Sequence, residues 1–218
     1  MNKKIISLFL VALASTSSTV QASMTRLTTP LHEAAQRGFD DSLTYLIKQC
    51  PDYLNTQDSS GFTPLHHAAA EGHPACVTIL LNAHANINAT HNAGKTPLHF
   101  AAEYGRTECV ILLLAHPDIN ELAIDDYGWT PLHFAAARGY VDCVKALAAK
   151  NSTTNAINFG EWTPLHAAVK NRHVDCINFL LEQGADIADT PDLATEKGFL
   201  DLAQYLKEQA QKRLENQK

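Results

Sequence analysis

Histidine and cysteine are the residues of this chain with the most obvious chemical potential. The sequence holds eleven histidines and five cysteines in 218 residues. Imidazole and thiolate groups are the usual ligands of zinc, and the segment "HHAAAEGH" places His66, His67 and His73 close together. Accessible thiols can also form disulfides or react with oxidants. Zinc binding and thiol chemistry are therefore the first two activities to weigh.

The spacing of the histidines favours a structural role over metal binding. Five of them end the tetrapeptide TPLH, which recurs at steps of 33 or 34 residues: His32, His66, His99, His133 and His166. The others, His73 and His173 among them, look scattered over the repeating units. No pair shows a ligand spacing that a carboxylate or a cysteine in register supports. We therefore expect no metal site and no cofactor.

Four cysteines keep the same period and are called the register cysteines below: Cys76, Cys109, Cys143 and Cys176. Their position predicts the inward face of a second helix in each unit. Packed helices lie about 8–10 Å apart, whereas a disulfide needs its Cα atoms within about 7 Å. We expect buried thiols that act as small apolar side chains. Cys50 is out of register and is the one candidate for an exposed thiol, although a silent role is favoured.

Motifs of catalysis and of nucleic-acid binding are absent from the sequence. It contains no G-x-S-x-G elbow, no G-x-x-x-x-G-K-[ST] loop, no H-E-x-x-H helix and no G-x-G-x-x-G fingerprint. The formal net charge is −6, and no basic stretch suggests a nucleic acid as partner. The sequence therefore predicts a protein that is not an enzyme and does not bind nucleic acid.

The recurring segments describe one repeated helical unit. In each copy a threonine precedes a proline, which suits an N-cap followed by the first helical position. A glycine ends this helix in most copies, and an apolar run such as "CVTILL" predicts a second helix. A single unit cannot bury its apolar face alone, so the units must stack in a row. A fixed period in this range is typical of repeat proteins.

The pattern T-P-L-H-x-A-A, followed by an apolar run and by "ANIN" or "GADI", resembles the ankyrin family over residues 27–206. The resemblance implies an all-α ankyrin-repeat solenoid of about five helix-turn-helix repeats plus a degenerate C-terminal cap. It also implies a structural role for the five TPLH histidines, each of which would tie its own turn to the neighbouring one by hydrogen bonds.

The same resemblance implies that a protein partner binds the concave face through the hairpin tips and the residues before each helix-ending glycine. At those positions the sequence has Phe62, Glu71, Lys95, Tyr104, Asp126, Tyr127, Trp129, Arg138, Phe159, Trp162 and Asn171. Trp, Tyr and Arg are enriched at the energetic centres of protein interfaces. The two tryptophans occupy one slot in successive units, where either packing or binding would explain them.

Two departures from the pattern affect the last units. Glu161 stands where a turn glycine is expected, which predicts a distorted fifth hairpin. In residues 189–206 the hairpin is lost and Asp192 takes the place of the histidine. We expect this segment to cap the core with Leu193, Phe199, Leu202 and Leu206, ahead of a polar tail over 207–218.

The N-terminal residues have the pattern of an export signal. "MNKK" is a basic start, residues 5–14 are apolar, and Val20-Gln21-Ala22 fits a cleavage site. We expect a cleaved signal peptide over 1–22 and an ankyrin-repeat domain over 23–206. The apolar stretch is too short to span a bilayer, which needs about 20 residues. The mature protein is then periplasmic or secreted, with a bacterial origin favoured over a eukaryotic one.

These observations predict an exported, non-catalytic and monomeric interaction module that binds a protein partner. The alternative is a thiol- or metal-buffering or oxidative-stress accessory protein of the periplasm. The rate at which the native thiols react would separate the two.

Overall fold

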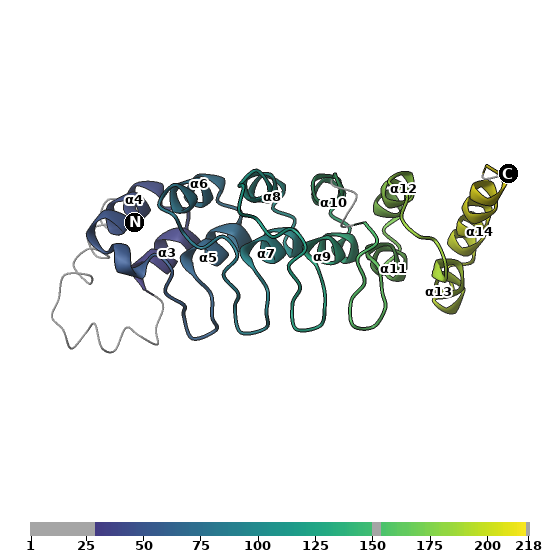
Figure 1. The fold of residues 1–218 in the computed structure, drawn as a ribbon, viewed down its shortest axis with the longest axis horizontal. Helices are drawn as coiled ribbons and strands as arrows, with labels where there is room; N and C mark the ends of the chain where they lie inside the picture. Colours follow the sequence, from purple (N-terminus) through teal and green to yellow (C-terminus); the bar gives the residue numbers. More distant parts are fainter. Residues whose placement is uncertain (1–28, 150–153, 217–218) are drawn as a thin grey trace.

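The computed structural model describes residues 29–149 and 154–216, which form a row of stacked helical pairs (Figure 1). Over these residues the secondary structure is helical, without strands, and confirms the predicted all-α solenoid. The predicted signal peptide and its cleavage site lie outside the described residues.

Each of the five units contributes two antiparallel helices and all units stack in sequence order (Figure 1). The first helices are α3 (Pro30–Gln36), α5 (Pro64–Glu71), α7 (Pro97–Glu103), α9 (Pro131–Arg138) and α11 (Pro164–Lys170). The second helices are α4 (Asp40–Gln49), α6 (Pro74–Asn82), α8 (Thr107–Leu114), α10 (Val141–Ala148) and α12 (Val174–Glu182). A 3-10 turn, η2 (Pro51–Tyr53), follows α4, and the chain ends with α13 (Thr190–Glu196) and α14 (Leu200–Glu215).

The first helices all begin in the same way. In α5, Thr63 is the N-cap, Pro64 is the first helical residue, and His66 completes a capping box. The threonine hydroxyl and the imidazole together satisfy backbone N–H groups that a helix start leaves without partners. Because the other four units repeat this arrangement, the TPLH tetrapeptide fixes where every first helix begins.

The core is one continuous layer of leucine, alanine and valine side chains that runs along the stack. Leu65 and Leu98 in the first helices and Leu80 and Leu113 in the second helices are fully buried, as are the paired alanines of each first helix. First helices pack on first helices and second helices on second helices of the next unit. The small alanines allow this close approach, and each unit depends on its neighbours for burial.

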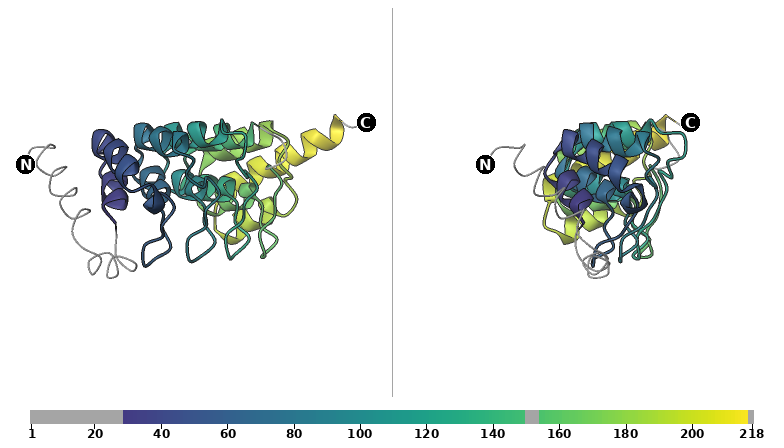
Figure 2. Two further views of the ribbon diagram at one scale, coloured as in Figure 1. Left: turned by 60° about the vertical axis from the view of Figure 1, so that its left-hand side comes forward. Right: turned by 90° about the vertical axis from the view of Figure 1, so that its left-hand side faces the viewer.

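The hairpins between units project from one edge of the stack, side by side (Figures 1 and 2). Backbone hydrogen bonds join each tip to the next: the N–H of Asn92 donates to Ser60 O at 3.2 Å, that of Asp126 to Ala93 O at 3.2 Å, and that of Phe159 to Tyr127 O at 3.2 Å. The tips therefore form a continuous ladder along the molecule.

The hairpin of the fifth unit has the same turn as that of the fourth, so the prediction that it is distorted was wrong. Asn158 Oδ1 accepts the N–H groups of Gly160 and Trp162, both at 2.9 Å. In the hairpin of the fourth unit, Asp125 Oδ1 accepts the N–H groups of Tyr127 and Trp129 in the same way, also at 2.9 Å. Glu161 adopts the left-handed conformation that glycine would supply, with φ 63°. A non-glycine residue costs about 1 kcal/mol there, which the hydrogen bonds of the turn offset.

The C-terminal helix pair covers the end of the core. Leu202 and Leu206 are buried, and Leu193 and Phe199 pack against the core cluster. The expected tail over 207–218 continues α14 as far as Glu215, and Arg213 donates hydrogen bonds to the carbonyl oxygens of Ala185 and Leu181. Most of that tail is therefore an anchored part of the cap.

Candidate functional site

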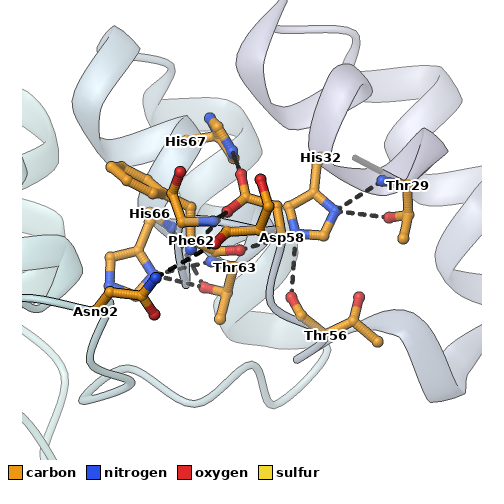
Figure 3. A network of polar contacts seen from close by, with 11 residues as sticks. Thr29, His32, Thr56, Asp58, Phe62, Thr63, His66, His67 and Asn92 are labelled. Atoms are coloured by element: carbon orange, nitrogen blue, oxygen red, sulfur yellow. Dashed lines mark hydrogen bonds and ion pairs between the residues drawn. The ribbon is translucent and has the colours of Figure 1, made fainter. Parts of the chain in front are cut away.

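The TPLH histidines clasp successive units together. His66 Nδ1 lies 3.1 Å from the N–H of Thr63, and its Nε2 lies 3.2 Å from the carbonyl oxygen of Lys95 in the next unit. His32 contacts the carbonyls of Phe62 at 2.9 Å and Thr56 at 3.1 Å (Figure 3). Each imidazole thus connects its own helix start to the following hairpin.

The remaining TPLH histidines follow the same pattern up to the end of the stack. His99 Nε2 lies 3.0 Å from Trp129 O, and His133 Nε2 lies 2.8 Å from Trp162 O. His166 keeps the contacts to Thr163. Since no hairpin follows the fifth unit, this last histidine lies beneath the cap, and Asp192 is exposed.

The clasp requires neutral imidazole. Nδ1 accepts from a backbone N–H, so the single proton must sit on Nε2, where it donates to a carbonyl. Burial lowers the pKa of His66, His99 and His133 to about 4 in each case, since hydrogen bonds to the next hairpin only partly offset desolvation. These histidines serve the scaffold and are poor candidates for acid–base chemistry near neutral pH.

A second clasp, which the sequence analysis missed, lies at the other end of the first helices α3, α5 and α9. His73 Nε2 lies 3.0 Å from Gln36 O, and His173 Nε2 lies 3.0 Å from Ala137 O. Arg106 Nε donates to Ala70 O at 2.8 Å from the equivalent position. The prediction that these histidines are scattered was therefore wrong, because they share one slot.

The sequence did contain a signal for this slot, because its residues recur at the period of the repeats. His73, Arg106, Tyr140 and His173 follow one another at the repeat spacing, but their residue types differ. Each side chain lies over the glycine that ends the first helix of the preceding unit. At Gly139, for example, a Cβ would come within 2.4 Å of His173 Nδ1. The glycine is therefore needed for stacking as well as for its positive φ.

The register cysteines are buried thiols, as predicted. Burial raises the pKa of Cys109 and of Cys176 to about 11, and nearby acidic side chains add to the rise. Cys76 Sγ donates to Asp40 Oδ1 at 3.0 Å, and Cys143 lies 3.3 Å from the Thr107 hydroxyl. Nucleophilic attack needs the thiolate, so these positions argue against thiol chemistry. Cys50 is half-buried.

The concave face, formed by the first helices and the hairpins, holds an ion triad of Lys95, Glu103 and Arg138. Lys95 Nζ lies 2.6 Å from one carboxylate oxygen of Glu103, and Arg138 lies 3.1 Å from the other. Burial opposes the charge of Glu103, but these two cations outweigh it and lower the pKa of the carboxyl group. Lys95 and Arg138 were predicted binding residues. Arg138 joins the fourth unit to Glu103 of the third, and Lys95, in the same unit as Glu103, reaches the fourth unit through the Phe134 ring, 4.1 Å from its Nζ.

Two hollows lie along the concave face between the hairpins and the first helices. One, of about 290 Å³, is lined by residues that include Lys95, Tyr127, Trp129 and Phe134. The other, of about 360 Å³, is lined by residues that include Phe62, Glu71, Tyr104 and Arg106. The structure thus brings six of the predicted binding residues to the walls of two neighbouring hollows.

The two tryptophans are half-buried and pack mainly against their own unit. The ring of Trp129 lies 5.1 Å from that of Phe134 and 5.6 Å from that of His133. Lys170 Nζ lies 4.9 Å from the Trp162 ring centroid. Their carbonyl oxygens also accept the histidine clasps. Both residues therefore stabilise the stack, and Trp129 in addition presents part of its ring to a hollow.

The other predicted binding residues differ in how freely they reach solvent. Tyr127 and Phe159 are well exposed on adjacent tips, and Asp126, which precedes Tyr127, is exposed as well. Phe62 is enclosed by other rings, with its centroid 4.7 Å from that of Phe100. The Asn171 side chain donates to Ala167 O at 3.0 Å within its own helix.

Several exposed residues of the hairpins were missed. Leu122, Ile124 and Ile157 are exposed although they are aliphatic. They precede the turns, outside the slots that the resemblance assigns to binding. The available signal was a short apolar run in each connection, Leu-Ala-Ile at 122–124 and Ala-Ile at 156–157, but such runs also fit an ordinary extended segment.

Within residues 29–149 and 154–216, no three His, Cys, Asp or Glu side chains converge in a way that could hold a metal ion. Among the helices of the same ranges, none combines the length and the apolar character needed to cross a bilayer.

The family model described as "Ankyrin repeats (3 copies)" matches residues 2–91, 31–123, 83–158 and 120–191. Similar proteins include Ankyrin repeat and SOCS box protein 3 of Bos taurus, 40% identical over 63 residues, which are 28% of this chain and 12% of that protein. Another is the 26S proteasome non-ATPase regulatory subunit 10 of Dictyostelium discoideum, 43% identical over 53 residues, 24% of this chain and 23% of that protein.

A third relative is Alpha-latrotoxin-Lhe1a of Latrodectus hesperus, 48% identical over 46 residues, 21% of this chain and 3% of the toxin. The chain thus spans under a quarter of the length of each of these proteins, and the similarity is confined to the repeats. Ankyrin repeats generally mediate protein–protein interaction and are typically non-catalytic. With four overlapping matches that extend over most of its length, this chain belongs to the ankyrin-repeat family.

Proposed function

We propose that this protein is an exported adaptor without catalytic activity, which binds a protein partner on its concave face. The observation that carries the proposal is the pair of hollows beside the hairpins, of about 290 and 360 Å³. The smaller one has mainly apolar walls, and the larger one combines aromatic with charged side chains. Concave sites lined by apolar groups and a few placed polar groups are the usual form of a binding site.

The ion triad explains how such a face could stay in shape before a partner arrives. Lys95 and Glu103 are mostly buried, and Lys95 Nζ also lies 4.1 Å from the centroid of the Phe134 ring. These contacts fix the wall of the smaller hollow. A wall that is ordered in the free protein reduces the entropy lost on binding.

The test is affinity capture by the purified protein, followed by calorimetry with the captured partner in purified form. The concave-face variant is Tyr104→Ala with Tyr127→Ala, two exposed side chains. The control variant is Thr78→Ala with Lys145→Ala, exposed positions on the second helices α6 and α10. We expect at least about a tenfold loss of affinity, or about 1.4 kcal/mol, for the first variant. An equal effect of both variants would exclude the concave face.

Export is proposed on the sequence alone. The basic start, the apolar stretch and the small residues before position 23 support cleavage after Ala22. Mass spectrometry of the protein recovered from cell fractions gives the test. A mature form that begins at Ser23 in the periplasm or the medium supports export, and an uncleaved form in the cytoplasm contradicts it.

A further inference from the structure

An unusual run of apolar side chains lies exposed on the fourth and fifth units, along the connections that carry the last two hairpins. We name it the apolar edge, and it consists of Leu122, Ile124, Tyr127, Ile157 and Phe159. Their exposed fractions are 44%, 48%, 71%, 63% and 72%. Exposed apolar clusters on a folded protein usually mark a contact surface.

Tyr127 and Phe159 lie side by side because the hairpins stack. The N–H of Phe159 donates to Tyr127 O, and the Phe159 ring lies directly over Gly128, where a Cβ would meet it at 2.8 Å. Ile124 and Ile157 share the slot before the turn. In the second unit this slot holds Gln57, whose side chain reaches the next hairpin: its Nε2 donates to Thr90 O at 2.7 Å.

The earlier hairpins provide an internal comparison. In the slot of Ile124 and Ile157 they carry Gln57 and Thr90, which are also exposed. The scaffold therefore folds with polar residues at this position. The stack therefore does not require Ile124 and Ile157 to be apolar, which favours a role for them in binding.

The segments that carry the apolar edge are acidic. Residues 115–130 and 183–189 contain no Lys or Arg, and neither do residues 154–163. These segments have five exposed carboxylates: Asp118, Asp126, Glu161, Asp186 and Asp189. Asp186 is held there by its N–H, which donates to Asn155 Oδ1 at 2.8 Å. Lys95 lines a hollow beside Tyr127, but its charge is paired with Glu103. Such an acidic field attracts a cationic partner and repels an anionic membrane.

The ladder of hairpin tips favours an extended partner segment. The carbonyl oxygens of Ser60, Ala93 and Tyr127 each accept an N–H from the next tip. Gly160 holds the equivalent position in the fifth hairpin, after which residues 183–189 lead directly from α12 into α13. An extended chain can pair with such a backbone edge while its side chains enter neighbouring pockets.

From these observations we infer that the apolar edge binds an extended basic segment of a partner protein, in which two or more aliphatic or aromatic side chains are flanked by Lys or Arg. This inference rests on the proposed function and specifies the chemistry of the partner. The apolar residues supply contact area, and the carboxylates supply orientation and salt dependence.

The test uses a random twelve-residue peptide library displayed on phage and selected against the purified protein. Selected peptides are then labelled, and their affinity is measured by fluorescence anisotropy. The edge variant is Ile124→Gln with Ile157→Gln, which copies Gln57 of the second unit and leaves Tyr127 of the concave face untouched. The control variant is Thr78→Ala with Lys145→Ala, exposed positions on the second helices. A third variant, Tyr104→Ser with Arg138→Gln, reports on the concave face. Circular dichroism establishes that all three variants remain folded.

We expect selected peptides with net positive charge and at least two large apolar residues. Their affinity should fall at least about tenfold on the edge variant and less than about twofold on the control variant. It should also weaken between about 0.05 and 0.5 M salt. Acidic peptides, or peptides that bind the edge variant as tightly as the wild type, would overturn the inference.

The outcomes also separate this inference from the proposed function. Peptides that lose affinity for the concave-face variant Tyr104→Ser with Arg138→Gln, but not for the edge variant, would leave the concave face as the binding site and refute the role of the apolar edge. If no peptide is enriched on the folded protein, the inference about the apolar edge fails, whereas the proposed function stands or falls with the capture experiment.

Discussion

The histidine clasps make the stability of this protein sensitive to acid. His66, His99 and His133 have a folded-state pKa of about 4, against an ordinary value of 6.5. Because the folded-state pKa is the lower one, the unfolded chain binds more protons once the pH falls below 6.5. The stability present above pH 6.5 is therefore lost progressively as the pH falls towards 4.

The size of this effect follows from the two pKa values. At pH 5 an unfolded histidine is almost fully protonated, whereas a folded clasp histidine is about one-tenth protonated. The difference costs about 2 kcal/mol for each histidine, or about 6 kcal/mol for all three. Since domains of this size are stable by about 5–15 kcal/mol, a large part of the free energy of unfolding should disappear between pH 7.5 and pH 5.

A single substitution separates this mechanism from general acid denaturation. His133→Gln removes one titrating clasp, and we expect about 2 kcal/mol lower stability at pH 7.5 from the lost buried hydrogen bonds. Between pH 7.5 and 5, the free energy of unfolding of this variant should then fall by about 2 kcal/mol less than that of the wild type. The control is His84→Asn, an exposed residue in the left-handed conformation, which should keep the wild-type pH dependence.

The assay is urea denaturation at both pH values, followed by far-ultraviolet circular dichroism. If His133→Gln loses as much stability between pH 7.5 and 5 as the wild type, the histidine clasps do not carry the pH dependence. Equal stability of the wild type at the two pH values would refute the reasoning directly.

Three further predictions concern the stack itself. Gly139→Ala should lower the free energy of unfolding by more than about 2 kcal/mol, because the new Cβ would come within 2.4 Å of His173. Gly184→Ala is the control, since nothing lies within 4 Å of its Cβ, and it should cost only about 1 kcal/mol. Urea denaturation measures both values. Titration of the native protein with a thiol reagent should label Cys50 first and the register cysteines only after unfolding; rapid labelling of all five would contradict their burial. Lys95→Met removes one cation of the ion triad and should lower the free energy of unfolding by about 2 kcal/mol, an effect that a double-mutant cycle with Glu103→Gln would assign to the pair.

The repeat fold was largely predictable from the sequence, because the same local signals for helix starts and buried faces recur in every unit. The Thr–Pro pair marks the start of each first helix, and the number of copies of the TPLH tetrapeptide gives the number of units. The inward position of the register cysteines followed from the same period. The distortion expected at Glu161 did not occur, since the hydrogen bonds of Asn158 hold the turn and impose the left-handed conformation.

Contacts between units were harder to predict, because they join residues of different type about one repeat apart. The slot of His73 and Arg106 holds a clasp whose partner is a backbone carbonyl, which leaves no pattern of its own in the sequence. The ion triad likewise draws Lys95 from a hairpin and Arg138 from the following unit.

The sequence by itself determined the family, the helix starts and the buried face of every unit, since capping, helical period and apolar burial act within one repeat. Only the tertiary structure decided which exposed side chains come together, such as those of the apolar edge. That grouping depends on the stacking of neighbouring hairpins, which brings together residues that are distant in the chain.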